Sequence, residues 1–197
     1  LATSDTDTYQ ALRPFWDNIT YRYPWNLPYF PSGVSEPVFS HPGGFYEEAF
    51  PLTLASSVPG SQIFFTIDGS KPALTPNGSV LGSTMAYHGP IQIQERTGAQ
   101  DNLASIRTTH LDDYQFTPEN VVKINVIRAV VVDPQGNRSD VVTQSFLVGQ
   151  NISSHYSLPV VSLATDSRYF FDPEIGFYVP GEAFEEQHLV WFNPANY

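Results

Sequence analysis

Three aromatic side chains near the N-terminus, Trp16, Tyr23 and Trp25, are candidates for stacking against sugar rings. An aromatic face with a polar edge suits such an amphipathic ligand. These rings lie in residues 1–33, a segment rich in aromatic residues and proline. Because proline lacks a backbone donor and favours extended or turn conformations, we expect an irregular arm here. The alternative is that the rings bury themselves as a strap on the flank of the following domain.

Carboxylates gather in a long polar segment, residues 94–119, which contains Asp101, Asp112, Asp113 and Glu119. Carboxylate oxygens could bind Ca²⁺, but the segment lacks the alternating acids and invariant glycine of an EF-hand. We therefore interpret it as a solvated acidic loop. The five histidines are far apart and form no HExxH motif, and cysteine is absent. No metal site and no cofactor is predicted.

No motif of nucleophilic or phosphoryl-transfer catalysis occurs in the sequence. It contains neither G-x-S-x-G nor a P-loop, so we assign no catalytic residue. The dipeptide Asp68-Gly69 follows an apolar run and precedes Pro72. Because Asp-Gly tolerates positive φ and reverses the chain tightly, we interpret these residues as a hairpin motif and not as a catalytic acid.

The charge and composition of the chain restrict its partners. The formal net charge is −11, which disfavours binding to nucleic acid or to an acidic membrane surface. No run of about 18 apolar residues occurs, so no membrane span is predicted. Four N-x-S/T sequons occur, which matter only in a eukaryotic secretory route. They begin at Asn18, Asn77, Asn137 and Asn151.

The central part of the chain alternates between strand and turn patterns. We expect strands at residues 37–40, 50–55, 62–67, 87–93, 121–132 and 140–148, and loops at residues 70–86 and 94–119. Residues 62–67 are apolar almost throughout, which indicates a central strand covered on both faces. The predicted core contains Leu54, Ile63, Phe65, Val126, Ile127, Ala129 and Val130. With no helical crossover, this pattern favours an all-β, immunoglobulin- or fibronectin-like antiparallel sandwich.

The chain therefore divides into three predicted parts. An irregular arm spans residues 1–33, the sandwich spans residues 34–149, and residues 150–197 form a linker and the start of another domain. In this last part we expect a strand at residues 158–164, one helical turn at 168–172 and a strand at 176–181.

Two family resemblances extend this interpretation. The first resemblance rests on the segment Ile63-Phe64-Phe65-Thr66-Ile67-Asp68-Gly69-Ser70-Lys71-Pro72, which follows Gly43-Gly44-Phe45-Tyr46 and Leu52-Thr53-Leu54 in the chain. These segments together resemble the chitobiase/hexosaminidase C-terminal-type domain. That domain is an immunoglobulin- or fibronectin-like module of secreted bacterial carbohydrate enzymes and their relatives. This resemblance implies a sandwich and a possible role in binding carbohydrate.

A second resemblance is to the N-terminal part of bacterial CotH proteins and spans about residues 34–197. It rests on the order of Gly89-Pro90-Ile91, Glu95-Arg96-Thr97, Asn102-Leu103, Val126-Ile127-Arg128-Ala129-Val130, Ser157-Leu158-Pro159-Val160-Val161-Ser162-Leu163, Gly176-Phe177-Tyr178-Val179-Pro180-Gly181 and Pro194-Ala195-Asn196-Tyr197. The family contains atypical, secretory-pathway-type protein kinases, whose catalytic residues follow the segment that resembles residues 194–197. None of these residues can be assigned in this sequence.

The resemblance implies a non-catalytic accessory module of a secreted or cell-surface bacterial protein. Its expected partner is a downstream kinase-like domain of the same polypeptide. The alternative is a carbohydrate-binding module that uses exposed aromatic residues to bind a polysaccharide. A cell-surface protein is a further possible partner.

Overall fold

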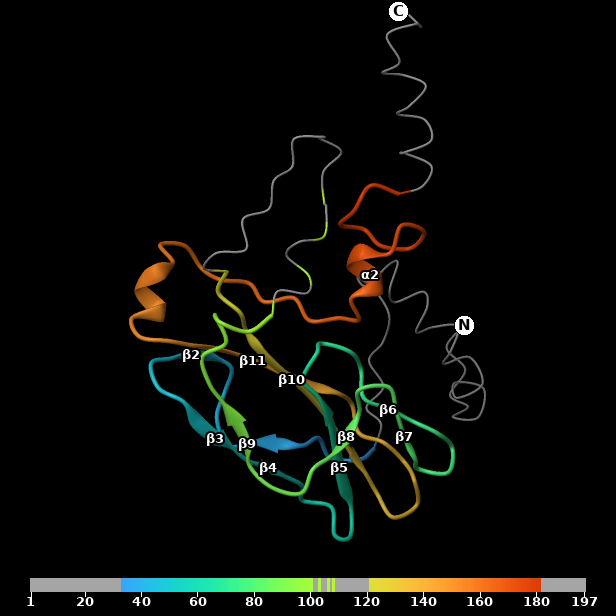
Figure 1. Ribbon diagram of the computed structural model, residues 1–197. Helices are drawn as coiled ribbons and strands as arrows, with labels where there is room; N and C mark the ends of the chain where they lie inside the picture. The colour runs from blue at the N-terminus through green and yellow to red at the C-terminus, as the bar shows by residue number, and fades with distance from the viewer. Residues whose placement is uncertain (1–32, 101–102, 104–105, 107, 109–120, 182–197) are drawn as a thin grey trace, which may run out of the picture. The chain divides into compact units, whose positions relative to one another are not determined.

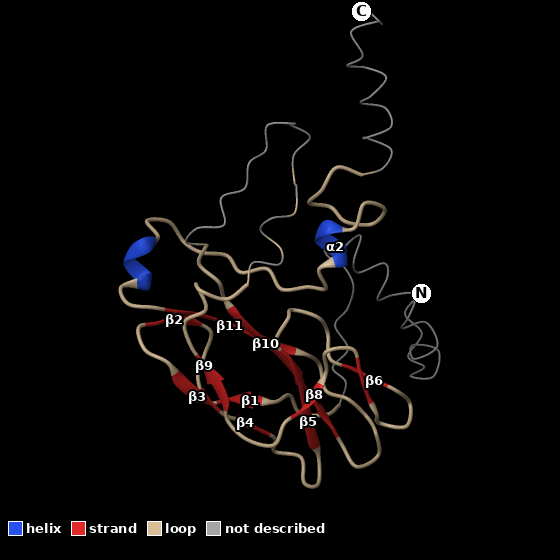
Figure 2. Ribbon diagram, in the orientation of Figure 1, coloured by secondary structure: helices blue, strands red, loops and turns tan. Residues whose placement is uncertain are grey.

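The computed structural model describes residues 33–100, 103, 106, 108 and 121–181, and these residues form an all-β structure (Figure 2). The chain divides into two units, residues 1–31 and residues 32–197, of which the first lies outside the described residues. The described helices are two four-residue segments, η1 (Ile152–His155) and α2 (Arg168–Phe171). Within the described ranges, no helix is long and apolar enough to cross a membrane.

The largest sheet has five strands in the spatial order β2-β11-β10-β5-β8 (Figure 1). Its strands are β2 (Gly44–Tyr46), β11 (Val142–Val148), β10 (Asn125–Val132), β5 (Gln62–Thr66) and β8 (Met85–Ala86). The long strands β10 and β11 are antiparallel and are joined by the predicted turn at residues 133–137. Strand β2 pairs with β11 in parallel, so the sheet is mixed and the prediction of purely antiparallel pairing is wrong at this edge.

Three two-stranded sheets accompany the large sheet. They pair β1 (Val38–Phe39) with β4 (Leu54–Ala55), β3 (Phe50–Leu52) with β9 (Ile91–Ile93), and β6 (Ala73–Leu74) with β7 (Val80–Leu81). All three pairs are antiparallel. With the five-stranded sheet they form a sandwich, which confirms the predicted fold class.

The hydrophobic core lies between the inner face of the five-stranded sheet and the strands β3, β4 and β9. It contains the buried residues Leu52, Leu54, Ile63, Phe65, Ile93, Ile127, Ala129, Val131, Phe146 and Val148. A smaller cluster lies on the outer face of the five-stranded sheet, where Leu74 of β6 packs against Phe64 of β5 and Val130 of β10. Strand β5 is therefore buried on both faces, as its continuous apolar run predicted. Val126 is only half-buried and belongs to neither cluster.

Several predicted strand boundaries are wrong because pairing partners change along the chain. Residues 50–55 form two strands, since the chain leaves β9 after Leu52 and pairs with β1 from Leu54. Residues 87–90 are not part of a strand, and β9 begins only after Pro90, which has no N–H to donate. The predicted loop at residues 70–86 contains three short strands, β6, β7 and β8.

The segment after the sandwich differs from the sequence prediction in two places. Residues 158–164 and 176–181 are not strands, because no described strand pairs with them. The helical turn is confirmed as α2. Residues after it fold back onto it, since the Phe177 N–H donates to the carbonyl oxygen of Tyr169 at 3.0 Å and the Tyr178 N–H to that of Phe170 at 2.9 Å.

Candidate functional site

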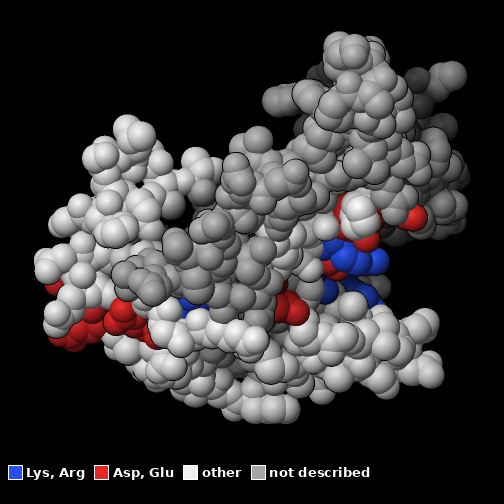
Figure 3. Space-filling view, turned by 45° about the horizontal axis from the view of Figure 1, so that its top comes forward, with Lys and Arg blue, Asp and Glu red and all other residues white. Residues whose placement is uncertain are grey.

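The candidate site lies on the outer face of the five-stranded sheet, where the Asp68–Gly69 turn meets the segment that follows the sandwich. A cavity of about 350 Å³ opens there, and its lining includes Asp68, Ser70, Lys71, Ser83, Asp166 and Ser167. The lining is therefore mostly polar and combines carboxylates, hydroxyls and one lysine. In the view of Figure 3, acidic and basic side chains gather side by side at one place on the surface.

The Asp68–Gly69 turn is held by its own side chains. The Asp68 carboxylate accepts hydrogen bonds from the Ser70 backbone N–H at 3.0 Å and from the Ser70 hydroxyl at 2.6 Å. The Ser70 hydroxyl also contacts the Ser83 hydroxyl at 2.8 Å, which links the turn to the loop after β7. Gly69 has φ +83°, a backbone conformation that favours glycine.

This turn is not the predicted hairpin. The strand before it, β5, pairs with β10 and β8, whereas the next strand, β6, pairs with β7. The chain therefore leaves the five-stranded sheet at Asp68. Pro72 is buried and directly precedes β6, so it starts a short strand outside that sheet.

Arg128 connects the large sheet to this turn. It lies on β10, and its Nη1 donates to the Gly69 carbonyl oxygen at 2.8 Å. Its Nε is buried and has no hydrogen-bond partner among the described residues. Burial lowers the pKa of Arg128, and the nearby Asp68 carboxylate partly opposes this effect. The guanidinium remains charged at neutral pH, because arginine normally loses its proton only in strongly basic solution.

Asp166 brings a second carboxylate to the cavity from the segment after the sandwich. It accepts a hydrogen bond from the Arg168 N–H at 3.0 Å and forms an ion pair with the Arg168 Nε at 3.3 Å. The Arg168 backbone hydrogen bond, together with that ion pair, holds the pKa of Asp166 below its ordinary value. The charge of Asp68 acts in the opposite direction, so the two carboxylates repel each other across the cavity.

The Asp68 carboxylate should make the stability of the protein depend on acidic pH. Partial burial by itself would raise the pKa of Asp68, but hydrogen bonds from Ser70 and Ser83 outweigh it and hold the pKa below the ordinary value of an aspartate. The folded state therefore binds fewer protons there than the unfolded state. The contribution of the ionised Asp68 carboxylate to the free energy of unfolding is therefore fully present above about pH 4. It is lost as the pH falls through the lower pKa that Asp68 has in the folded state.

We expect Asp68→Asn to flatten the decrease in unfolding free energy below pH 4, as measured by urea denaturation at several pH values. Asp140→Asn is a suitable control, because Asp140 is a half-buried carboxylate far from this turn in the sequence. Identical pH profiles of Asp68→Asn and the wild type would show that these hydrogen bonds do not favour the ionised carboxylate.

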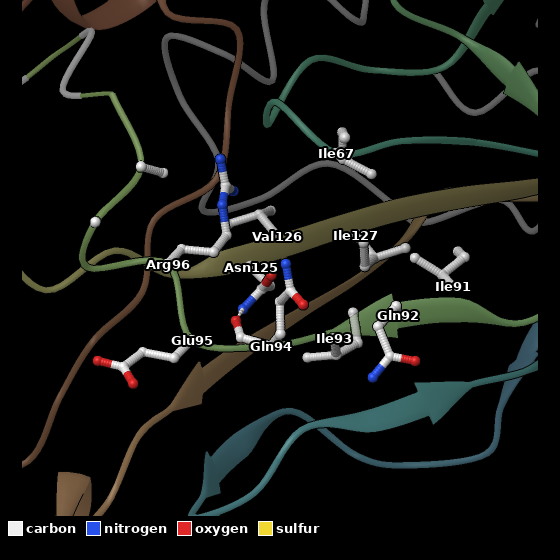
Figure 4. Close-up of a pocket in the computed structure, with 12 residues that line it drawn as sticks. Ile67, Ile91, Gln92, Ile93, Gln94, Glu95, Arg96, Asn125, Val126 and Ile127 are labelled. Carbon is white, nitrogen blue, oxygen red and sulfur yellow. Dashed lines mark hydrogen bonds between the residues drawn. The ribbon is translucent and has the colours of Figure 1, made fainter.

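A second hollow lies at the opening between the two layers of the sandwich (Figure 4). This groove of about 400 Å³ lies between β9 and the first residues of β10. The Asn125 Nδ2 donates to the Gln94 carbonyl oxygen at 2.8 Å, and an Arg96 Nη1 donates to the Ile124 carbonyl oxygen at 3.4 Å. Both bonds join the layers beside the groove, so its polar groups serve to hold the sandwich together.

The other predicted site residues are not brought to either hollow by the described structure. Trp16, Tyr23 and Trp25 lie outside the described residues, as do the loop acids Asp101, Asp112, Asp113 and Glu119. His41 hydrogen-bonds to Ser40 and stacks on Phe50. Among the residues that the structure describes, no three histidine, aspartate or glutamate side chains are grouped as metal ligands.

Sequence reasoning missed Arg128 and Asp166 as members of this site. An arginine within the apolar run of residues 126–132 is a signal that a charge points onto a sheet face. No pattern in the sequence could place Asp166 beside Asp68, because the two residues are far apart along the chain. The arrangement can bind polar groups through hydrogen bonds and charge, and Asp166 and Ser167 of the segment after the sandwich form part of its lining.

The strand arrangement agrees with one family comparison. Residues 52–146 match the family model described as Fn3 associated, where Fn3 denotes fibronectin type III. The match covers most of the sandwich, from β3 into β11. The fold and this match together indicate a fibronectin type III-associated domain over residues 52–146, which suggests an accessory module. A search of curated proteins found no match to the chain.

Proposed function

We propose that this chain is a non-catalytic accessory module that fixes the position of the polypeptide following its sandwich. In the proposed context it belongs to a secreted or cell-surface, CotH-like bacterial protein and presents a downstream kinase-like domain. The Fn3 associated match at residues 52–146 supports the accessory role. The resemblance of the ordered residue pattern to the N-terminal part of CotH proteins is the reason for this context.

The observation that carries this proposal is the contact between residues 162–166 and the outer face of the sandwich. The Ser162 hydroxyl donates to the Ser145 hydroxyl on β11 at 2.8 Å. A Cβ atom added at Gly69 would lie only 3.1 Å from the Thr165 carbonyl oxygen. The backbone at residue 165 thus approaches the Asp68–Gly69 turn more closely than an ordinary side chain permits.

This arrangement restricts the path of the chain after the sandwich. A flexible linker samples many end positions, whereas a segment held at two points on a rigid sheet samples few. The contacts lie on two different strands or turns, β11 and the turn after β5, so they fix direction as well as position. The elements after Thr165, beginning with α2, are therefore held at one side of the sandwich.

We expect Gly69→Ala to release this segment. Alanine is strained at φ +83°, and its Cβ would crowd the Thr165 carbonyl oxygen at 3.1 Å. The backbone strain alone should lower the free energy of unfolding by about 1–3 kcal/mol. In addition, limited proteolysis and hydrogen exchange across residues 158–172 should become faster.

Gly136→Ala provides the matched control. Gly136 has φ +87°, similar to that of Gly69, but nothing lies within 4 Å of the Cβ position. This variant should therefore lose comparable stability without faster proteolysis of residues 158–172. If both variants left the segment equally protected, the contact with Gly69 would not hold it and the proposal would fail.

The carbohydrate-binding alternative stays a prediction. It depends on Trp16, Tyr23 and Trp25, which lie outside the described residues. A glycan array comparing the wild type with a Trp16→Ala, Trp25→Ala variant would test it directly.

A further inference from the structure

The tip of the β6–β7 hairpin carries the dipeptide Asn77-Gly78, in which an asparagine amide lies next to a residue without a Cβ atom. We propose that Asn77 is a site of covalent self-modification, at which the side-chain amide is lost as ammonia and an aspartate or isoaspartate is formed through a succinimide. No other asparagine of the sequence precedes a glycine. The proposal is independent of the proposed function, because it depends on this hairpin alone.

The reaction needs only water and a base in solution. The Gly78 backbone nitrogen loses its proton to the base and forms a bond to Cγ of Asn77, while the bond from Cγ to Nδ2 breaks and Nδ2 leaves as ammonia. Water then opens the succinimide ring at either of its carbonyls. Opening at the main-chain carbonyl gives isoaspartate, in which the chain continues through Cγ. In total, water is consumed, ammonia is released and the chain gains a carboxylate.

The reacting groups are accessible in the folded protein. Asn77 is exposed, and its side-chain amide makes no hydrogen bond to another residue that the structure describes. Gly78 is also exposed, and nothing lies within 4 Å of the position that a Cβ atom would take. Because glycine has only hydrogen atoms on Cα, no side chain shields the attacking nitrogen.

The barrier in the folded state is the opening of a short turn. The Gly78 N–H donates to the Thr75 carbonyl oxygen at 3.0 Å, and the Thr75 N–H donates to the Ser79 carbonyl oxygen at 2.9 Å. Strands β6 and β7 have two residues each and, among the described strands, pair with each other alone. Such a pair is marginally stable, so its exposed tip opens at a low cost in free energy. Arg138 donates to the Leu74 carbonyl oxygen at 3.0 Å and holds the base of the hairpin, which confines the opening to its tip.

Two other positions show how the fold prevents the same reaction. Asp68 also precedes a glycine, but its carboxylate is ionised at neutral pH and therefore carries no good leaving group. The Ser70 N–H and hydroxyl additionally hold it, at 3.0 and 2.6 Å. Asn137 is as exposed as Asn77, but its Nδ2 donates to the Asp133 carboxylate at 2.8 Å, and the next residue has a long side chain. Asn77 has neither form of protection.

The modification changes the outer face of the sandwich. It adds a negative charge to the hairpin that contributes Ala73 and Leu81 to the lining of the cavity beside Asp68. Isoaspartate also lengthens the main chain of the loop by a carbon atom. We therefore expect weaker pairing of Leu74 with Val80 in the isoaspartate form.

Peptide mapping of the folded 197-residue chain tests the proposal. The peptide that contains Asn77 should gain the mass difference between an amide and a carboxyl group, and it should become a substrate of protein isoaspartate methyltransferase. The rate should rise about tenfold per pH unit from neutral to mildly basic buffer, because the attacking nitrogen must first lose its proton. The peptide that contains Asn137 should stay unchanged in the same sample.

Three outcomes would overturn the proposal. The first is conversion of Asn77 in concentrated urea but not in native buffer, which would show that the folded hairpin protects it. The second is equal conversion of Asn77 and Asn137. The third is a gain in mass without methylation, which would show that water hydrolyses the amide directly and that Gly78 takes no part.

Alanine substitutions separate the role of the Gly78 nitrogen from the stability of the hairpin. Gly78 has φ +80° and Gly82 has φ +58°, and neither has an atom within 4 Å of the Cβ position, so alanine strains the backbone at both. Gly78→Ala should slow the conversion of Asn77 at least about tenfold, because the added Cβ crowds the attacking nitrogen. Gly82→Ala should convert at least as fast as the wild type. Equal rates in the two variants would contradict the proposed attack.

Discussion

Replacing Phe146 with alanine is expected to lower the free energy of unfolding by about 3–5 kcal/mol. Phe146 lies on β11 in the core and is 0% exposed. Its ring is 5.7 Å from the ring of Phe50 and 6.0 Å from that of Tyr46, measured between centroids. Truncation removes these contacts and leaves a cavity between the two layers, which a β-sandwich closes poorly because its strands are fixed by hydrogen bonds.

Phe45→Ala is the matched control for this prediction. Phe45 lies on the edge strand β2 and is 41% exposed. Phe45→Ala should lower the free energy of unfolding clearly less than Phe146→Ala does in the same chemical or thermal denaturation experiment. Equal losses for the two variants would mean that the core does not lie between β3 and β11 as described.

Asn125→Ala is expected to lower the free energy of unfolding by about 1–3 kcal/mol. Asn125 is buried at the start of β10, and its Nδ2 donates to the carbonyl oxygens of Gln94 at 2.8 Å and Phe146 at 3.4 Å. Alanine would leave these oxygens without that donor. Since Gln94 directly follows β9, the loss would also separate the two layers beside the groove (Figure 4).

Gln94→Ala is the control for this prediction, because it removes the Gln94 side chain but keeps the backbone carbonyl that accepts the bond from Asn125. The Gln94 side chain is exposed. We expect unfolding free energies within about 0.5 kcal/mol of the wild type, as is usual for surface substitutions. A large loss in Gln94→Ala, or none in Asn125→Ala, would contradict the role of this bond.

These effects bear on the proposed role of the module. A sandwich held by a continuous core and by bonds between its layers provides a stiff base for the segment at residues 158–172. The Gly69 substitution acts on this segment, whereas Phe146 and Asn125 act on the base. Comparing the two sets of variants therefore distinguishes release of the segment from loss of the sandwich.

Local patterns in the sequence were sufficient to predict the fold class, part of the hydrophobic core and most strand positions. Alternation of apolar residues and turn residues depends on local chemistry, so it correctly placed β5, β10 and β11, with Ile63, Phe65, Ile127 and Ala129 in the core. The same local signals indicated the helical turn at α2 and the turn at residues 133–137.

The folded arrangement of the chain sets which strands pair and which polar residues meet. The parallel pairing of β2 with β11 and the change of partner at Thr53 depend on residues far apart in the chain. The same holds for Asp68, Arg128 and Asp166, which come from a turn, a strand and a later segment. Pairing and charge contacts of this kind are set by the whole packed arrangement, and no local pattern in the sequence contains them.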